Sequence, residues 1–294
     1  MKIAISGKRR ISAEQASEIG RFLNVLLAAI PDVLLVVNER YRAVVMPLLD
    51  SVEPKNWHED TSLKGCDIAL SIGGDGTFLR TARWIGGHEI PILGINSGHL
   101  GYLTDLTLEE APALVSNIAA LDFAVERRSL LAVEVKGDDI PQVAYPFALN
   151  EVAVLRDDSA GIIAVDTMLD TLPLATYHAD GLIISTPTGS TGYNLSVGGP
   201  ILSPNAGNFV LSPVAPHSLT MRPLVVCDSS TIDISVQARS GSFCLALDGR
   251  SLTLPATATL RITRAPFVTR VMLRRSHNFA ETLRNKLLWG LDAR

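Results

Sequence analysis

The chain has 294 residues, long enough for one large or two modest domains that bury a core without disulfides or a structural metal. Its 26 basic and 30 acidic residues give a formal net charge of −4, which argues against a surface built to bind nucleic acid. The three scattered cysteines form no CxxC pair, and no apolar stretch reaches the ~20 residues of a membrane span, so we expect a cytoplasmic protein without membrane contact.

The first hundred residues alternate short apolar runs with helix-like stretches, which predicts βαβ units around a parallel sheet. A strand at 2–6 precedes a helix over 13–30, for which Ser12 is a suitable N-cap. The same pattern predicts strands at 33–37, 68–72 and 90–95, and a helix over 77–84.

From about residue 120 the pattern becomes that of an all-β region, followed by a helix over 278–288. The predicted strands are 130–135, 146–155, 162–169, 181–185, 232–236, 243–247 and 258–262. Asp248-Gly249 is typical of a hairpin turn. We expect the basic pairs Arg127/Arg128 and Arg274/Arg275 to be solvated strand ends.

A glycine-rich turn, residues 71–77 (SIGGDGT), lies where a predicted strand ends and a helix begins. Closely spaced glycines let backbone N–H groups approach phosphate oxygens, and the helix N-terminus adds partial positive charge. Asp75 would repel a phosphate unless it held a metal or accepted a proton. In a simpler interpretation, Asp75 only caps the helix. GxxxxGK[S/T] does not occur, and Leu79 stands where a third glycine would complete GxGxxG.

Two further segments carry polar groups suited to a nucleotide. Residues 177–200 (YHADGLIISTPTGSTGYNLSVGGP) contain a strand followed by a run of hydroxyl and glycine residues, with Tyr193 beside them as a flat face for a ring. Asn150 and Glu151 interrupt an apolar strand, where a ribose diol would satisfy both side chains; an edge-strand pair is the simpler interpretation.

Four segments, taken together and in order, resemble the NAD kinase family: GGDG at 73–76, GINSGHLGYL at 94–103, LNE at 149–151 and DGLIISTPTGSTGYNLSVGGP at 180–200. Residues 216–219 (PHSL), 222–224 (RPL) and 248–249 (DG) are also similar to that family. GGDG alone is shared with lipid kinases and phosphofructokinases, so the long central segment is the specific one.

The resemblance implies a fold of class α/β plus all-β. It places a Rossmann-like domain over 1–110, a β-sandwich dinucleotide-binding domain over 111–276, and a segment over 277–294 that packs back on the first domain. It also implies a homo-oligomer, either a dimer or a tetramer. The molecules that it is expected to bind are the nucleotides NAD and ATP.

The resemblance further implies that ATP, with a divalent cation such as Mg²⁺, phosphorylates the adenosine-ribose 2′-hydroxyl of NAD to give NADP. Asp75 would accept the proton. The residues expected to contact the nucleotide are Gly74, Asp75, Gly76, Asn150, Glu151, Asp180, Thr191, Gly192, Tyr193, Asn194, Leu195 and Ser196. Arg80, His178, Ala215 and Arg250 are further candidate nucleotide contacts, at positions where members of the family differ; His178 is alternatively only a half-buried histidine. No residue is expected to be a dedicated metal ligand.

Two other functions remain open at this point: a lipid kinase that shares GGDG, and a sensor that binds NAD(P) without catalysis. A lipid acceptor needs an apolar cavity, against which the polar STPTGSTGY loop argues. The sequence also leaves open ATP or inorganic polyphosphate as the donor, and NAD or NADH as the acceptor.

Overall fold

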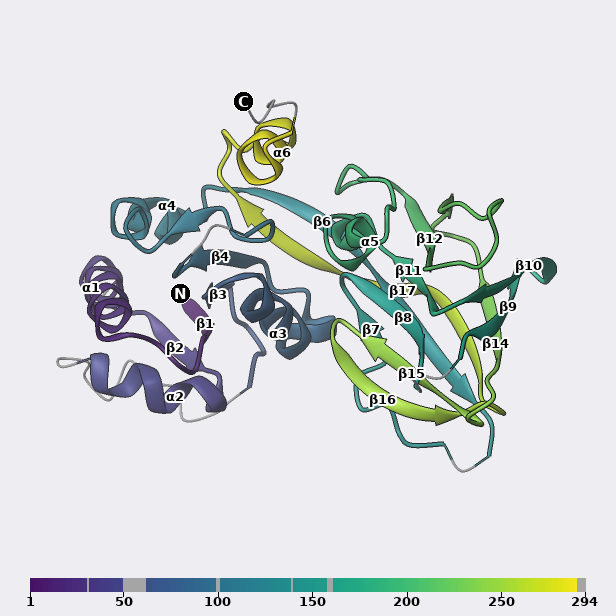
Figure 1. Cartoon of the computed structure of the whole chain (residues 1–294). Helices are drawn as coiled ribbons and strands as arrows, with labels where there is room; N and C mark the ends of the chain where they lie inside the picture. Colours follow the sequence, from purple (N-terminus) through teal and green to yellow (C-terminus); the bar gives the residue numbers. More distant parts are fainter. Residues whose placement is uncertain (31, 50–61, 99–100, 139, 158–160, 290–294) are drawn as a thin grey trace. The chain divides into compact units, whose positions relative to one another are not determined.

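A computed structural model describes residues 1–30, 32–49, 62–98, 101–138, 140–157 and 161–289 (Figure 1). The chain forms two compact units. Unit 1 comprises residues 1–127 and 269–294, and unit 2 comprises residues 128–268. Both domain boundaries that the resemblance implies, after 110 and after 276, fall inside unit 1. The chain returns to unit 1 at residue 269, before its last helix begins at Phe279.

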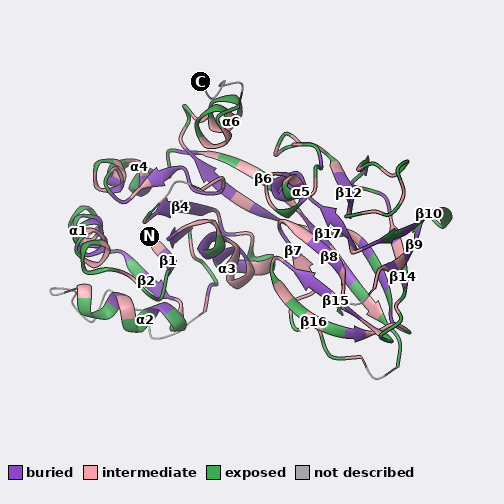
Figure 2. Ribbon diagram, viewed as in Figure 1, coloured by how far each residue is buried: buried purple, intermediate pink, exposed green. Residues whose placement is uncertain are grey.

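Unit 1 is built on a parallel sheet of strand order β2-β1-β3-β4, which the end of β17 extends beside β4. Its strands are β1 (Lys2–Gly7), β2 (Leu34–Val37), β3 (Ile68–Ile72), β4 (Ile92–Asn96), β5 (Leu106–Thr107), which pairs with β4, and the last residues of β17 (Thr259–Leu273). Every residue of β3 and β4 is buried (Figure 2). Such burial on both faces is typical of a parallel sheet between helices.

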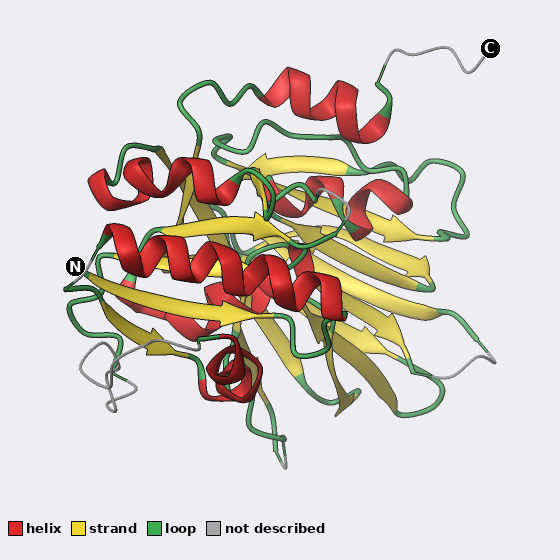
Figure 3. Cartoon of the chain, turned by 90° about the vertical axis from the view of Figure 1, so that its left-hand side faces the viewer, coloured by secondary structure: helices red, strands yellow, loops and turns green. Residues whose placement is uncertain are grey.

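The helices of unit 1 are α1 (Ala13–Ala29), α2 (Glu39–Val45), α3 (Asp75–Ile85), α4 (Val115–Ala120) and α6 (Phe279–Leu287), with 3-10 turns at Met46–Leu48, Gly86–His88 and Ala111–Leu114 (Figure 3). Helix α1 begins at the predicted cap, since Ser12 and Gln15 form a capping box. Apolar side chains of α1, α2 and α4 pack on the sheet. Within the described residues, no helix is both long and apolar enough to cross a membrane.

Unit 2 consists of two sheets that enclose an apolar core. One has the order β10-β9-β14-β17, with β6 and β7 attached, and the other has the order β13-β12-β11-β8-β15-β16. The strands are β6 (Ala124–Lys136), β7 (Phe147–Ala148), β8 (Glu151–Arg156), β9 (Ile163–Leu169), β10 (Leu172–Ala179), β11 (Gly181–Ser185), β12 (Asn208–Val214), β13 (Leu224–Cys227), β14 (Ile232–Gln237), β15 (Ser242–Leu247) and β16 (Arg250–Pro255). A 3-10 turn (Thr188–Thr191) and α5 (Tyr193–Ser196) follow β11. The predicted class, α/β plus a β-sandwich, is confirmed.

Two sequence predictions are corrected. The single strand expected at 146–155 is two strands, β7 in one sheet and β8 in the other, with the crossing at Leu149 and Asn150. The basic pairs are not merely solvated: Arg128 is buried and donates to the Thr188 hydroxyl, and the Nη1 of Arg274 lies 3.0 Å from a Glu110 carboxylate oxygen. Partners far away in the sequence thus contact both guanidinium groups.

Candidate functional site

The glycine-rich loop leaves the buried strand β3 and begins helix α3. Gly73 has a φ of 149°, and a Cβ atom there would lie 2.5 Å from the hydroxyl oxygen of Thr77, so only glycine fits. Gly74 is the N-cap residue, and it makes no side-chain cap. An uncapped helix N-terminus at the carboxyl edge of a parallel sheet suits a phosphate group.

Asp75 is the first residue of α3, but its carboxylate does not cap that helix. The backbone N–H of Tyr102 donates to Oδ2 at 2.8 Å, and the backbone N–H of Leu103 donates to Oδ1 at 3.0 Å. A Cβ atom on Gly101 would lie 1.9 Å from Oδ1, so the backbone reaches the carboxylate only because residue 101 is glycine. The capping interpretation is therefore wrong, and the two N–H groups fix the orientation of the carboxylate.

The backbone that holds Asp75 belongs to the predicted GINSGHLGYL motif. The buried amide of Asn96 donates to Thr104 Oγ1 at 3.1 Å, and Asn96 Oδ1 accepts the N–H of Gly98 at 2.7 Å. Thr104 Oγ1 also accepts the N–H of Gly101 at 3.2 Å. These bonds tie both ends of the loop together; residues 99–100 of the motif lie outside the described residues.

Two cationic side chains lie close to the residues around Asp75: Arg80 beside the glycine-rich loop, and Lys286 beside Tyr102. Arg80 Nη2 donates to Thr77 Oγ1 at 2.8 Å, and Arg80 Nη1 lies 3.9 Å from where a Cβ atom on Gly76 would be. Lys286, from α6, lies over the ring of Tyr102 with Nζ 5.3 Å from the centroid. Burial lowers the pKa of Lys286, against the charges of Asp75 and Asp105, which raise it. No local pattern predicts a role for Lys286, because a lone lysine on a polar helix is ordinary.

In unit 2, Asn150 and Glu151 lie where the chain crosses from one sheet to the other. The β15–β16 hairpin turn bends back onto this crossing, with φ values of 47° at Asp248 and 74° at Gly249. The Asp248 carboxylate accepts the backbone N–H groups of Leu149, Asn150 and Glu151 at 2.8, 2.8 and 3.2 Å. Asp248-Gly249 is thus a hairpin turn, as predicted, and it also supports the Asn-Glu pair.

Both side chains of the Asn-Glu pair carry a buried oxygen without a hydrogen-bond partner in the described structure: Asn150 Oδ1 and Glu151 Oε2. Burial raises the pKa of Glu151 to about 7, and the neighbouring charge of Asp248 adds to this shift. Buried polar atoms normally find partners, so two unpaired acceptors side by side favour a ligand that donates hydrogen bonds. The hydroxyls of a ribose are such donors.

The hydroxyl- and glycine-rich segment packs directly on this pair. A Cβ atom on Gly189 would lie 2.0 Å from the carbonyl oxygen of Asn150, and one on Gly192 would lie 3.4 Å from Glu151 Oε2. The Thr186 N–H donates to the same Asn150 carbonyl at 2.9 Å. Gly192, the adjacent Thr191 and the exposed Tyr193 therefore lie beside Asn150 and Glu151.

Other predicted residues have side chains that serve the fold. Asn194 is fully buried: its amide donates to the Ser190 and Pro200 carbonyls, and its Oδ1 accepts the hydroxyl of Ser212 at 2.6 Å. The Arg250 guanidinium donates to the backbone carbonyls of residues 145 and 147 at 2.9 and 2.7 Å. Leu195 is half-buried and Ser196 exposed on the same short helix.

A third group of predicted residues lies at the opposite end of β11. Asp180 precedes β11 and lies 3.3 Å from Arg156 Nε. His178 and Ala215 are both exposed. They lie near Asp180, since the Asp180 N–H donates to the Val214 carbonyl and the His217 N–H donates to the His178 carbonyl. Glu151 pairs with Ser185, which is five residues after Asp180. At ~3.3 Å per residue, Asp180 and Glu151 are therefore roughly 17 Å apart along the sheet.

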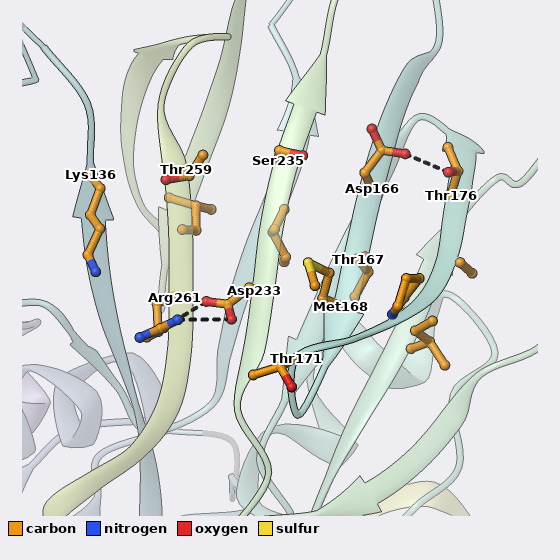
Figure 4. Close-up of a pocket in the computed structure, with 15 residues that line it drawn as sticks. Lys136, Asp166, Thr167, Met168, Thr171, Thr176, Asp233, Ser235, Thr259 and Arg261 are labelled. Carbon is orange, nitrogen blue, oxygen red and sulfur yellow. Dashed lines mark hydrogen bonds and ion pairs between the residues drawn. The ribbon is translucent and has the colours of Figure 1, made fainter.

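A cavity of about 620 Å³ lies elsewhere in unit 2, on the β10-β9-β14-β17 sheet (Figure 4). Two pairs of side chains are bonded at its surface: Arg261 with Asp233, and Thr176 with Asp166. None of the predicted nucleotide-binding residues lines it. This cavity is therefore separate from the predicted nucleotide-binding residues.

Two family models match the sequence. The ATP-NAD kinase N-terminal domain matches residues 32–123, and the ATP-NAD kinase C-terminal domain matches residues 149–273. An NAD kinase of Porphyromonas gingivalis W83 is 43% identical over 293 residues, covering 100% of this chain and 99% of the relative. An NAD kinase of Bacteroides fragilis is 47% identical over 228 residues, covering 78% of each chain.

Solved structures with the same fold come from two further kinases. Yeast NADH kinase complexed with NADH superposes with a TM-score of 0.88 at 22% identity, covering 100% of this chain and 89% of the other. An NAD kinase from Archaeoglobus fulgidus in complex with ATP has a TM-score of 0.73 at 25% identity, covering 98% and 97%. The sequence motifs, the two family models and relatives of 43–47% identity agree, and the chain belongs to the NAD kinase family.

Proposed function

We propose that Asp75 is the proton acceptor when this kinase phosphorylates the adenosine-ribose 2′-hydroxyl of NAD. The hydroxyl oxygen forms a bond to the γ-phosphorus of ATP, the bond from that phosphorus to the β–γ bridging oxygen breaks, and ADP leaves. The hydroxyl proton passes to the Asp75 carboxylate. The observation that carries the proposal is the pair of backbone N–H bonds that orient this carboxylate beside the GGDG loop.

Asn150 and Glu151 would hold the nucleoside. Their unpaired oxygens, Oδ1 and Oε2, accept hydrogen bonds from sugar hydroxyls, and Gly192 leaves the space beside them open. Thr191 and Tyr193 border the same space. A sugar bound here would satisfy two acceptors that otherwise destabilise the fold.

A divalent cation, with Mg²⁺ the proposed ion, would arrive with ATP. The described residues include no cluster of three or more His, Cys, Asp or Glu side chains that could hold a metal. Mg²⁺ commonly keeps several waters and binds mainly to substrate phosphates, so the phosphates of ATP would be its main ligands. The ion would neutralise charge on the phosphates, while the protein residues position the hydroxyl and accept its proton.

Incubation of the full chain with NAD, ATP and Mg²⁺ tests the function directly. We expect NADP and ADP in equal amounts, and no phosphorylated product when diacylglycerol or sphingosine replaces NAD. Binding of NAD without any NADP would mean a dinucleotide sensor and would contradict the proposal. Phosphorylation of the lipid acceptor would contradict it in a different way.

We also propose that the enzyme is cytoplasmic, where it would supply NADP, and that it works as a homo-oligomer. Cys66, Cys227 and Cys244 are all free thiols, which fits a reducing compartment. Asp180 and Glu151 are separated by the wholly buried strand β11, so a dinucleotide would contact both most directly if a second copy supplied one of them.

Subunit mixing tests the shared site. Asp180→Asn and Glu151→Gln chains, each of low activity alone, should regain activity when unfolded and refolded together, because some mixed sites would hold neither change. The mass in analytical ultracentrifugation should be at least twice 31.6 kDa. A monomer, or no regain of activity on mixing, would contradict the proposal.

A further inference from the structure

The last helix of unit 1 carries a lysine on its inward face. The half-buried residues of α6 recur at helical spacing: Phe279, Thr282, Leu283, Lys286 and Leu287. Arg284, two positions before Lys286, lies on the exposed side of the same helix. A lysine on the inward face gives up part of its hydration, and burial accordingly lowers the pKa of Lys286. Such a position destabilises the fold unless the ammonium group has a partner.

The start of α6 is anchored in unit 1 by hydrogen bonds. The buried Asp105 carboxylate accepts the backbone N–H of Arg274 at 2.6 Å, and its other oxygen lies 2.9 Å from His277 Nδ1. Asn278 Oδ1 then accepts the N–H of Ala280 at 2.9 Å and caps the helix. These bonds fix where the helix begins and therefore which way its inward side chains point.

The partner of Lys286 is the ring of Tyr102. Nζ lies over the ring, 5.3 Å from its centroid and within the ~6 Å of a cation–π contact. Among the described residues, no carboxylate lies within 4.0 Å of Lys286. The Tyr102 hydroxyl is buried and has no hydrogen-bond partner in the described structure. The hydroxyl therefore does not orient the ring, whereas the ammonium group contacts its face.

Tyr102 is also one of the two residues that hold the Asp75 carboxylate. Its backbone N–H donates to Oδ2 at 2.8 Å, beside the bond from the Leu103 N–H to Oδ1. Because side-chain rotamer and backbone conformation are coupled, a restrained ring also restrains this donor. Burial lowers the pKa of Lys286 and the charge of Asp75 opposes that shift, so the two opposite charges attract each other.

We infer that Lys286 is a positioning residue: through the Tyr102 ring, it keeps the Asp75 carboxylate in the orientation that receives the hydroxyl proton. The inference rests on the proposed function. Lys286 acts on the group that accepts the proton rather than on the nucleotide. Its loss should therefore lower kcat and leave the binding of NAD almost unchanged.

Steady-state kinetics of Lys286 variants test the inference. Lys286→Met removes the charge and should lower kcat about tenfold, as expected for a half-buried cation–π contact, with the KM for NAD within about twofold. Lys286→Arg should keep kcat within about twofold of wild type, because a guanidinium also binds an aromatic face. Arg284→Gln is the matched control and should keep wild-type kcat. Wild-type kcat in Lys286→Met, or a rise in KM in place of the loss in kcat, would overturn the inference.

A double-mutant cycle tests whether the charge acts through the ring. Tyr102→Phe retains the ring face and should keep kcat within about twofold of wild type, whereas Tyr102→Leu removes the face. In the Tyr102→Leu chain, adding Lys286→Met should lower kcat by less than about twofold. A full tenfold loss in that background would mean that Lys286 acts elsewhere, and it would overturn the inference.

Amide hydrogen exchange separates this inference from the proposed function, because it needs no turnover. The N–H groups of Tyr102 and Leu103 should exchange at least about threefold faster in Lys286→Met than in the wild type or Arg284→Gln, even if no NADP is formed. NADP formation by the wild type, with exchange at these two amides unaffected by Lys286→Met, would refute the positioning role alone.

Thermal melting distinguishes positioning from support of the fold. The melting temperature of Lys286→Met should change little, because relief of a desolvated charge offsets the lost contact. A lower melting temperature together with a loss of kcat that Lys286→Arg does not restore would contradict the inference, since Lys286 would then only support the fold.

Discussion

At the scale of single residues, the orientation of the Asp75 carboxylate depends on Gly101. The Tyr102 and Leu103 N–H groups can reach that carboxylate because residue 101 lacks a Cβ atom. The sequence identified Asp75 from its position among glycines, but it gave no indication of the partner. The two segments are 27 residues apart, and no local pattern encodes which backbone faces which side chain.

Gly101→Ala should displace the Asp75 carboxylate, because the new methyl carbon would lie 1.9 Å from Oδ1. A displacement of about 1 Å at a reacting group can cost roughly 10²-fold in rate, so we expect a fall in kcat of that size. Gly98→Ala is the control, since its Cβ atom would be no closer than 3.9 Å to its nearest neighbour. Equal kcat values for the two variants would contradict this role of Gly101.

Glu151 should make stability depend on pH. Its pKa is about 7 in the folded chain against 4.5 for an ordinary glutamate, so the folded state holds a proton that the unfolded state has released. Stability should therefore fall as the pH rises from about 4.5 to about 7 and then level off. Asp248, whose pKa is raised by burial despite its backbone hydrogen bonds, contributes in the same direction.

Glu151→Gln removes one of these two titrations. The melting temperature of the variant relative to the wild type should rise steadily between pH 5 and pH 7.5, because only the wild type is then forced to bury a charge at this position. Scanning fluorimetry at half-unit intervals would show it. Parallel melting profiles for the two proteins would mean that Glu151 ionises normally.

At the scale of secondary structure, the regular elements followed from local pattern, and the irregular connection did not. Strands β3 and β11 have the predicted bounds, because each is a continuous apolar run ended by polar or glycine residues. Strands β10, β12, β13 and β16 were not predicted: proline and polar residues interrupt β10, β12 and β16, and β13 has only four residues. The break at Leu149 was missed because the Asp248 carboxylate, 99 residues away, stabilises it.

Ser12→Ala should destabilise helix α1, because Ser12 accepts the N–H of Gln15 and completes a capping box. The expected loss in the free energy of unfolding is about 1 kcal/mol. Ser17→Ala, in the exposed middle of the same helix, should be neutral or slightly stabilising, since alanine is the better helix former. Urea denaturation followed by circular dichroism would measure both, and equal effects would contradict the capping role.

At the scale of the whole molecule, the division into units differs from the one that the motifs implied, because one long strand belongs to both. Strand β17 pairs with β14 through Leu260 and with β4 through Met272. The segment after it is tied to unit 1 by Asp105, which accepts the backbone N–H of Arg274 at 2.6 Å and lies 2.9 Å from His277 Nδ1. The resemblance implied that the C-terminal segment packs back on the first domain, but the residues that make these contacts are seen only in the structure.

The functional groups are likewise spread over the chain. The motifs predicted Asp75, Asn150, Glu151 and the 191–193 stretch, because glycines and hydroxyls crowd together in sequence there. Arg80 was a candidate from the sequence, but its position near Arg9, Arg40 and Arg83 was not predicted, since these residues follow β1 or lie in α2 and α3 and meet only in the fold. Charges that converge from distant segments leave no local signal.

Asp75→Asn removes the proposed proton acceptor and keeps the size of the side chain. Without a proton acceptor, kcat for NADP formation should fall roughly 10²–10⁴-fold, while the calorimetric affinity for NAD stays within about threefold of wild type. Asp32→Asn, at an exposed position in the same unit, should keep wild-type turnover. Wild-type kcat in a folded Asp75→Asn chain would contradict the assignment of Asp75 as the group that accepts the proton.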